Sequence, residues 1–151
     1  MKNYSILLLF LLVSFSSKAQ NWYAVAIADS GILTVKYKFT IDTGNSLIDT
    51  ISLDQARSIR AINALSIVKD VNNPRRQVIE RVKVSKFEIT ISDKEELNKS
   101  YFLGTSEILT NEMQEDLRKM SPGAMLVFEG IVVVSSNGLS SSAMPLMFHV
   151  K

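Results

Sequence analysis

The chain has 151 residues, of which 46% are apolar, and it contains no cysteine. This length suits one domain with a hydrophobic core, and the lack of cysteine excludes a disulfide, a thiolate zinc site and a cysteine nucleophile. The 17 basic residues exceed the 15 acidic ones by only two. Nucleic-acid-binding proteins usually carry a clear excess of Lys and Arg, so we expect no nucleic acid among the partners.

The N-terminus has the three-part layout of a secretory signal. A short basic segment precedes an apolar run at Ile6–Phe15, and small residues at Ser17 and Ala19 predict cleavage before Gln20. An apolar run of about ten residues is too short to cross a bilayer, which needs about 20 residues as a helix. We therefore expect signal residues 1–19, no membrane insertion after cleavage near Ala19–Gln20, and a periplasmic or secreted product.

The mature protein would then be one domain over residues 20–151. Cleavage would also remove Lys2 and Lys18, which lowers the number of basic residues from 17 to 15 and makes it equal to the number of acidic residues. A mature chain of balanced charge gives little reason to expect attraction to an anionic membrane surface.

Alternation of apolar and polar residues predicts strands near the start of the mature chain. The clearest pattern covers residues 32–42, and Trp22–Ala28 predicts an earlier strand, with a turn at Asp29–Gly31. Ser52 and Gln55 have the spacing of a capping box, which predicts a short helix over residues 53–61.

The apolar phase changes within the strand predicted over residues 78–91. Apolar residues occupy even positions up to Val84 and odd positions from Phe87 onward. A shift of one residue would turn the later side chains to the opposite face, so we predict a β-bulge near Ser85–Lys86.

The remaining residues predict a loop, a helix and two strands. The charged residues 93–100 indicate a loop, and Thr110 begins a helix that ends at Ser121–Gly123. Residues 125–134 predict a strand interrupted in phase at Gly130, and residues 144–150 a final one after an Asn137–Gly138 turn. The single histidine, His149, falls on the polar face of that strand, so we expect neither a histidine metal site nor any cofactor.

Asp42, Thr43 and Gly44 form the sequence Asp-Thr-Gly after an apolar strand, as in aspartic proteases. Their chemistry needs two aspartates that share a proton, so one copy per chain would require a homodimer of the retropepsin kind. Phe102–Gly104 resembles the downstream apolar-apolar-Gly element. Asn45 differs from that family's pattern, and the alternative is a strand that ends in a tight turn.

Basic residues concentrate in one stretch of the chain and acidic residues in the next. The segment 69–86 holds six basic and two acidic residues, whereas the segment 88–129 holds nine acidic and four basic ones. Either the two segments lie on separate solvated faces or neutralise each other, or the basic one docks a protein partner. The candidate binding residues are Arg75, Arg76, Arg81, Lys83 and Lys86.

The last hundred residues resemble the C-terminal domain of GldM and PorM, components of the type IX secretion and gliding motor of Bacteroidetes. Val82–Ile91 is similar to that family's F-K-V-x-S-F-x-V-x-I strand. Val127–Ile131 is similar to its V-x-F-E-D-I, with Gly130 at the acidic position, and Met144–Phe148 to its L-P-P-I-x-F. The helix from Thr110 with Ser121–Gly123 is similar to its T-x-E…L-x-x-L-x-x-G.

The resemblance implies a mainly β domain, an immunoglobulin-like β-sandwich with one or two short helices. It also implies contact with protein partners in the cell envelope and no catalytic residues. Without the motor subunit's transmembrane helix and further domains, we expect an accessory component rather than the motor subunit. A homodimeric protease that uses Asp42 and a structural envelope subunit are the open alternatives.

Overall fold

The computed structural model describes residues 22–33, 49–69, 72, 77–95 and 97–151. Within these residues the protein is mainly β with two short helices, which confirms the prediction at that level. The helices are α1 (Leu53–Arg57) and α2 (Asn111–Lys119). The strands are β1 (Trp22–Ala28), β2 (Gly31–Leu33), β3 (Asp49–Ile51), β4 (Ala61–Lys69), β5 (Gln77–Ser92), β6 (Lys99–Gly104), β7 (Met125–Val134), β8 (Ser140–Met144) and β9 (Leu146–Val150).

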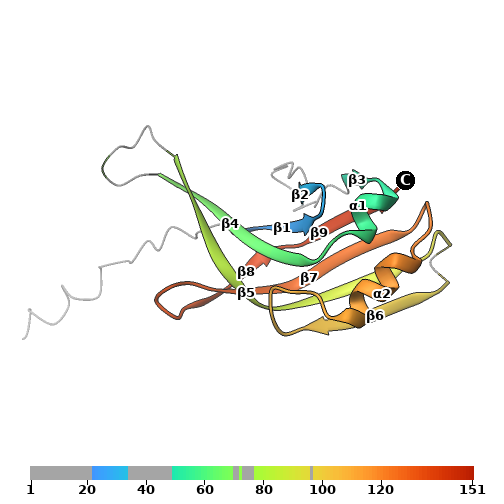
Figure 1. Cartoon of the computed structure of the whole chain (residues 1–151). Coiled ribbons are helices and arrows are strands. Elements are labelled where there is room, and N and C mark those ends of the chain that lie inside the picture. Colours follow the sequence, from blue (N-terminus) through green and yellow to red (C-terminus); the bar gives the residue numbers. More distant parts are fainter. Residues whose placement is uncertain (1–21, 34–48, 70–71, 73–76, 96) are drawn as a thin grey trace, which may run out of the picture.

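The described strands belong to one hydrogen-bonded sheet, and the long strand β5 joins its two parts (Figure 1). The first part of β5 pairs with β4, whereas the second part lies between β6 and β7. From β4 the sheet continues to β1, then through a short parallel pairing to β8, which lies beside β7. Because β7 pairs with β5, the path returns to its start and the sheet curls around a common interior.

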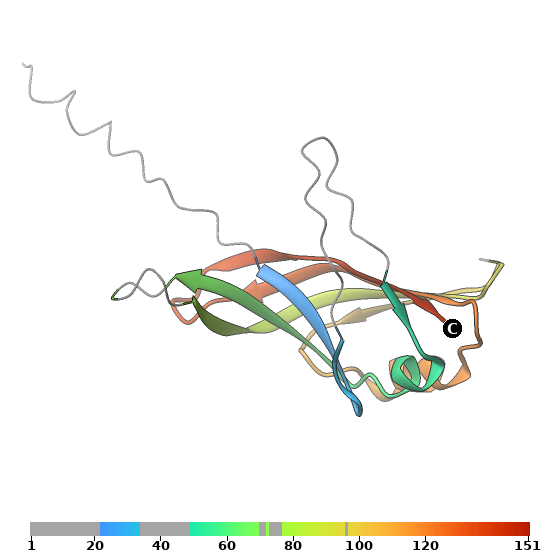
Figure 2. The same ribbon diagram turned by 90° about the horizontal axis from the view of Figure 1, so that it is seen from above.

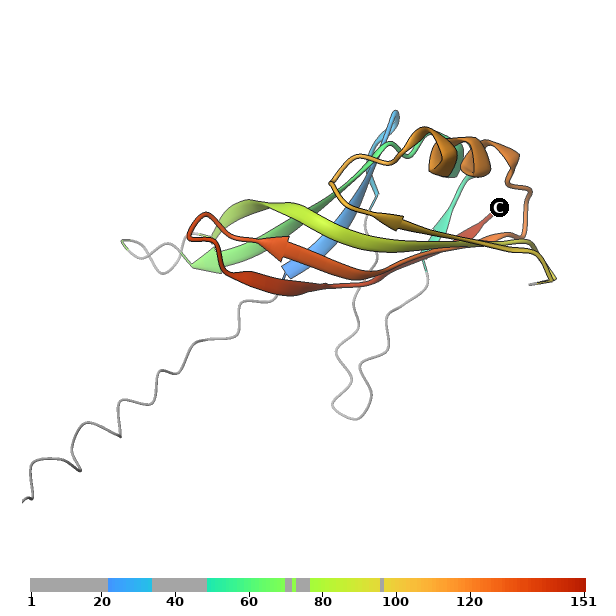
Figure 3. The ribbon, with the colours of Figure 1, turned by 90° about the horizontal axis from the view of Figure 1, so that it is seen from below.

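One hydrophobic cluster from the strands and both helices fills this interior. Phe87, Phe128 and Phe148 are fully buried, and the rings of Phe87 and Phe128 lie 6.0 Å apart with a tilt of 58°. The two helices contact each other and lie on one face of the sheet, at the end near the C-terminus (Figures 2 and 3). Their buried residues, Met113 and Leu117 among them, close that end of the core.

The predicted β-bulge is present in β5. Val84 pairs with Val133 of β7 and Lys86 with Val132, so Ser85 is an extra residue. Its hydroxyl donates to the carbonyl of Val132 at 3.2 Å. The strand β7 contains a second irregularity, where Gly130 has a φ of +57°. This agrees with the interruption of phase that the sequence shows there.

The two helices begin where the sequence predicts, but α1 ends earlier. The Ser52 side chain accepts from the Gln55 amide, and the Gln55 side chain accepts from the Ser52 amide, so the capping box is confirmed. The prediction that this helix reaches residue 61 is wrong, because Arg60 already donates its amide to Ile27 of β1. In α2, Thr110 caps the first turn by accepting from the Met113 amide.

The loop predicted over residues 93–100 ends earlier than predicted, because the strand β6 already begins at Lys99. Gly104 is the last residue of β6 and pairs with Phe87 of β5. Pairing with β5, rather than any strong alternation of its own, makes this segment a strand.

The predicted strand at the start of the mature chain agrees with the structure where it is described, whereas the one predicted over residues 144–150 begins only at Leu146, because Met144 belongs to the unpredicted strand β8. Trp22–Ala28 forms β1 and is followed by a turn into β2, which covers the beginning of the strand predicted over residues 32–42. The remainder of that strand lies outside the described residues. In β9, Phe148 and Val150 are buried and His149 is exposed, as the alternation predicts.

Candidate functional site

The bulge at Ser85 brings three of the five predicted binding residues onto one face of β5. Before the bulge, Arg81 and Lys83 are exposed and Val82 and Val84 are buried. Without an extra residue, Lys86 would point into the core, but Ser85 shifts the phase and leaves Lys86 exposed. The result is a continuous row that we call the basic row: Arg81, Lys83 and Lys86.

The basic row lies where the sheet forks. Pairing of β5 with β4 ends at Val82, and pairing with β6 begins only at Phe87. The chain after β6 then runs along β4, where the Ile62 amide donates to the carbonyl of Glu107 at 2.8 Å and Leu109 donates to Arg60. This brings Glu107 beside β5, and a shallow hollow of about 370 Å³ is lined by Arg81, Val82, Lys83 and Glu107.

Two members of the basic row, Arg81 and Lys86, contact partners within the protein. The Arg81 guanidinium donates to the side-chain oxygen of Asn63 at 2.7 Å, and Asn63 is only 6% exposed. The Lys86 ammonium lies 3.8 Å from a carboxylate oxygen of Glu88. This ion pair is at the long end of the range and half in solvent, so it is weak.

The acidic residues near the basic row come from the acidic segment that the sequence shows. Glu88 and Glu107 both belong to residues 88–129, and the fold places them beside Lys86 and beside Arg81 and Lys83. The two segments therefore offset each other in part, as one of the two alternatives requires. Lys83 and Lys86 nevertheless expose their side chains on the outer face.

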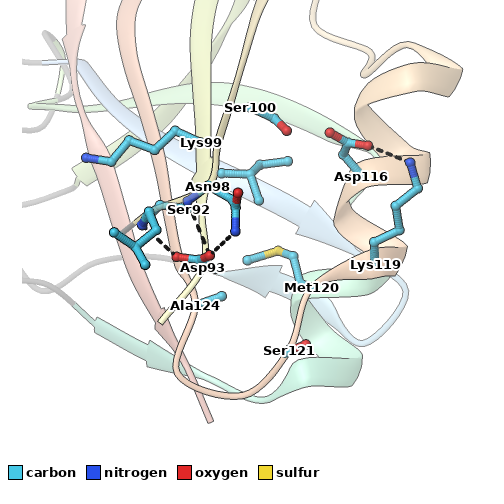
Figure 4. A pocket seen from close by; sticks show the side chains of 12 residues that line it. Ser92, Asp93, Asn98, Lys99, Ser100, Asp116, Lys119, Met120, Ser121 and Ala124 are labelled. Atoms are coloured by element: carbon cyan, nitrogen blue, oxygen red, sulfur yellow. Dashed lines mark hydrogen bonds and ion pairs between the residues drawn. The ribbon is translucent and has the colours of Figure 1, made fainter. Parts of the chain in front are cut away.

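A second hollow lies between α2 and the loop before β6, with a volume of about 530 Å³ (Figure 4). The Asp93 carboxylate accepts from the amides of Leu97 and Asn98 and from the Asn98 side chain at 2.6 Å. These hydrogen bonds, that of Asn98 foremost, lower the pKa of Asp93. The network ties Asp93 to Leu97 and Asn98, and the only indication of it in the sequence is an Asp and an Asn within a polar segment.

On the other wall of this hollow, Asp116 of α2 bonds to Ser100 of β6 and to Lys119. The Ser100 hydroxyl, and then the Lys119 ammonium at 2.9 Å, lower the pKa of Asp116. The same contact raises the pKa of Lys119. These groups satisfy each other, so this hollow is best understood as the seam that attaches α2 to the sheet.

The other predicted site residues lie outside the described part of the chain. Arg75 and Arg76 precede β5, and Asp42, Thr43 and Gly44 fall between β2 and β3. The aspartic protease hypothesis and the signal at residues 1–19 therefore stay predictions. Among the described residues, no three His, Asp or Glu side chains gather in a way that could hold a metal ion. None of the helices in this same part is long and apolar enough to cross a membrane.

No protein family, curated protein or solved structure matches this chain in the three comparisons made. The similarity to the GldM C-terminal domain accordingly stays a prediction.

Proposed function

We propose that the chain is an exported protein-interaction module of the cell envelope, without catalytic activity. By its resemblance it would be an accessory component related to type IX secretion or gliding. Its partner would be another envelope protein that presents an acidic surface to the basic row. The protein would act after signal cleavage, in the periplasm or outside the cell.

The basic row is the observation that carries this proposal. Its three cations share one outward face because of the Ser85 bulge, and two of them, Arg81 and Lys83, line a hollow at the fork of the sheet. Charges arranged in this way favour encounter with a partner of opposite charge and set its orientation. Glu88 and Glu107 offset the row only in part, so an acidic partner would still find Lys83 and Lys86 exposed.

The finer fold that we propose is an immunoglobulin-like β-sandwich of the GldM C-terminal type. One layer would hold β3, β9, β7, the second part of β5 and β6, and the other layer β2, β1, β4 and the first part of β5. The bulge in the matched strand supports this proposal. Gly130 is also compatible with it, because Asp and Asn tolerate a positive φ better than most residues, and the family has an acidic residue there.

Charge reversal in the basic row tests the proposed function. The tagged full chain would be produced in its native cells, and envelope proteins would be cross-linked to it and recovered. We expect Lys83→Glu/Lys86→Glu to lose most of one specific acidic partner, and the wild-type complex to weaken as salt is raised. Lys94→Glu/Arg118→Glu is the matched control, because it makes the same charge change at exposed positions away from the row.

Arg81 is left out of this variant because it also supports the fold. Its substitution would leave the oxygen of the buried Asn63 without its charged donor, and the resulting loss of stability would obscure the result. If wild type, variant and control recover the same proteins in the same amounts, the basic row is not the docking surface and the proposal fails.

A further inference from the structure

The strand β6 lies at one end of the sheet and leaves one edge open among the described residues. Within these residues it pairs with β5 only, and Figure 1 shows it at the margin of the sheet. An open edge presents a row of backbone N–H and C=O groups that can pair with another strand. Natural edge strands are usually protected by charges, Pro or bulges. The centre of β6, from Ser100 to Leu103, has no such residue.

Two large side chains stand exposed on the outer face of this edge. Tyr101 is 59% exposed and Leu103 is 50% exposed, whereas Phe102 between them is partly buried against the core. The Tyr101 hydroxyl is hydrogen-bonded to Glu88 of β5, which also raises the pKa of Tyr101. This bond holds the Tyr101 ring on the outer face, next to Leu103.

We propose that β6 pairs antiparallel with β6 of a second copy of this chain, about a twofold axis at Phe102. Residues that lie opposite each other in an antiparallel pair point to the same face of the sheet. This register places Tyr101 opposite the partner's Leu103, and Leu103 opposite the partner's Tyr101. One symmetric contact thereby covers Tyr101 and Leu103 in both copies, and the sheet continues from one copy into the other.

The acidic residues on the strands next to β6 make β6 of a second copy a better pairing partner than an acidic strand. Glu88 lies beside Leu103 on one side and opposite Glu129 of β7 on the other, so an acidic pair stands next to the edge on the outer face. A strand that brought further carboxylates would be repelled. The sequence of β6 contains no acidic residue and one lysine, Lys99, so a second copy brings a strand of compatible charge.

This surface adjoins the basic row at Lys86, whose partner Glu88 is hydrogen-bonded to Tyr101, but it lies apart from Arg81 and Lys83. The residues of β6 pair with Phe87–Ser92 of β5, whereas Arg81 and Lys83 lie along the part of β5 before the bulge. Pairing of a single short strand buries less area than a stable protein–protein interface needs. We therefore expect a dimer that forms reversibly with increasing concentration.

Analytical ultracentrifugation tests the proposal. The protein would be produced from its full-length gene and purified in the form that the cells export. Over a concentration series the wild type should shift from monomer to dimer. Leu103→Lys should remain monomeric, because a charge on the edge opposes pairing. Leu139→Lys is the matched control, since Leu139 is 67% exposed in the turn between β7 and β8, far from β6 in sequence; it should dimerise like the wild type. Circular dichroism would verify that both variants fold.

The register is tested by disulfide formation, because the chain has no cysteine of its own. A mixture of Tyr101→Cys and Leu103→Cys chains should form a cross-linked heterodimer on mild oxidation, well above the level of a Leu139→Cys mixture. A wild type that stays monomeric at every concentration would overturn the proposal. So would a Leu103→Lys variant that dimerises like its control, or cross-linking no greater than that of the Leu139→Cys mixture.

Discussion

Gly104 lies directly against the ring of Phe87, where β6 pairs with β5. A Cβ atom at Gly104 would overlap the ring carbons Cε1 and Cζ of Phe87. The Phe87 ring cannot easily move away, because it is fully buried and packs against the ring of Phe128. Glycine is therefore required here by the close approach of a side chain to the backbone, not by a special backbone conformation.

We predict that Gly104→Ala lowers the free energy of unfolding by about 1–3 kcal/mol, as expected for overpacking in a core. Urea denaturation followed by fluorescence of the single tryptophan would measure the change. Phe87→Leu supplies the control, since a smaller side chain makes room at the cost of a cavity. The double variant should lose less stability than the sum of the two single variants, and strict additivity would contradict the proposed contact.

At the scale of single elements, the sequence predicts those features that depend on the alternation of apolar residues or on a helix cap. The bulge at Ser85 follows from the change of apolar positions between Val84 and Phe87, and α2 follows from Thr110 and its apolar spacing. The strand β6 does not, because residues 99–104 lack a clear alternation and become a strand by pairing with β5. The sequence also shows an interruption at Gly130, but only the pairing shows that Gly130 and Ile131 together lie opposite Phe87, beside the first bulge.

The conformation of Gly130 makes a prediction about the strand β7. Because its φ is +57°, we expect Gly130→Ala to destabilise the protein by about 1–2 kcal/mol, the usual cost of a left-handed conformation for a residue with a Cβ. The added Cβ would also lie 3.2 Å from the carboxyl carbon of Glu88. Gly130→Asn should cost less, because Asn tolerates this region better. Thermal unfolding of the two variants would compare them, and equal losses would indicate that contact with Glu88, not φ, sets the cost.

At the scale of the whole molecule, contacts between distant segments decide both the candidate site and the packing of α2. The basic row could be predicted as a local excess of charge, and its common face from the predicted bulge. The approach of Glu107 could not, because it depends on how the chain after β6 passes along β4. The same holds for the seam in Figure 4, where Asp116 of α2 meets Ser100 of β6.

This seam makes the stability of the protein depend on pH. Hydrogen bonds from Ser100 and Lys119 lower the pKa of Asp116 below its ordinary value of 3.8. The folded state therefore favours the charged carboxylate, so the contribution of this group is complete above pH 3.8 and is lost as the pH falls through the folded-state pKa. Asp93 changes stability in the same direction, because its pKa is lowered by Asn98.

We predict that Asp116→Asn costs about 0.5–1 kcal/mol at pH 7, a modest value because Lys119 is 72% exposed and its charge is screened. The difference from wild type should shrink as the pH falls below 3.8 and through the lowered folded-state pKa of Asp116, because the wild-type carboxylate then becomes protonated as well. Urea denaturation at a series of pH values would measure both effects. Glu115→Gln is the matched control, since it removes one acidic charge from the exposed side of the same helix. A gap that stays constant from pH 7 to pH 2 would mean that Asp116 supports α2 through its shape rather than through its charge.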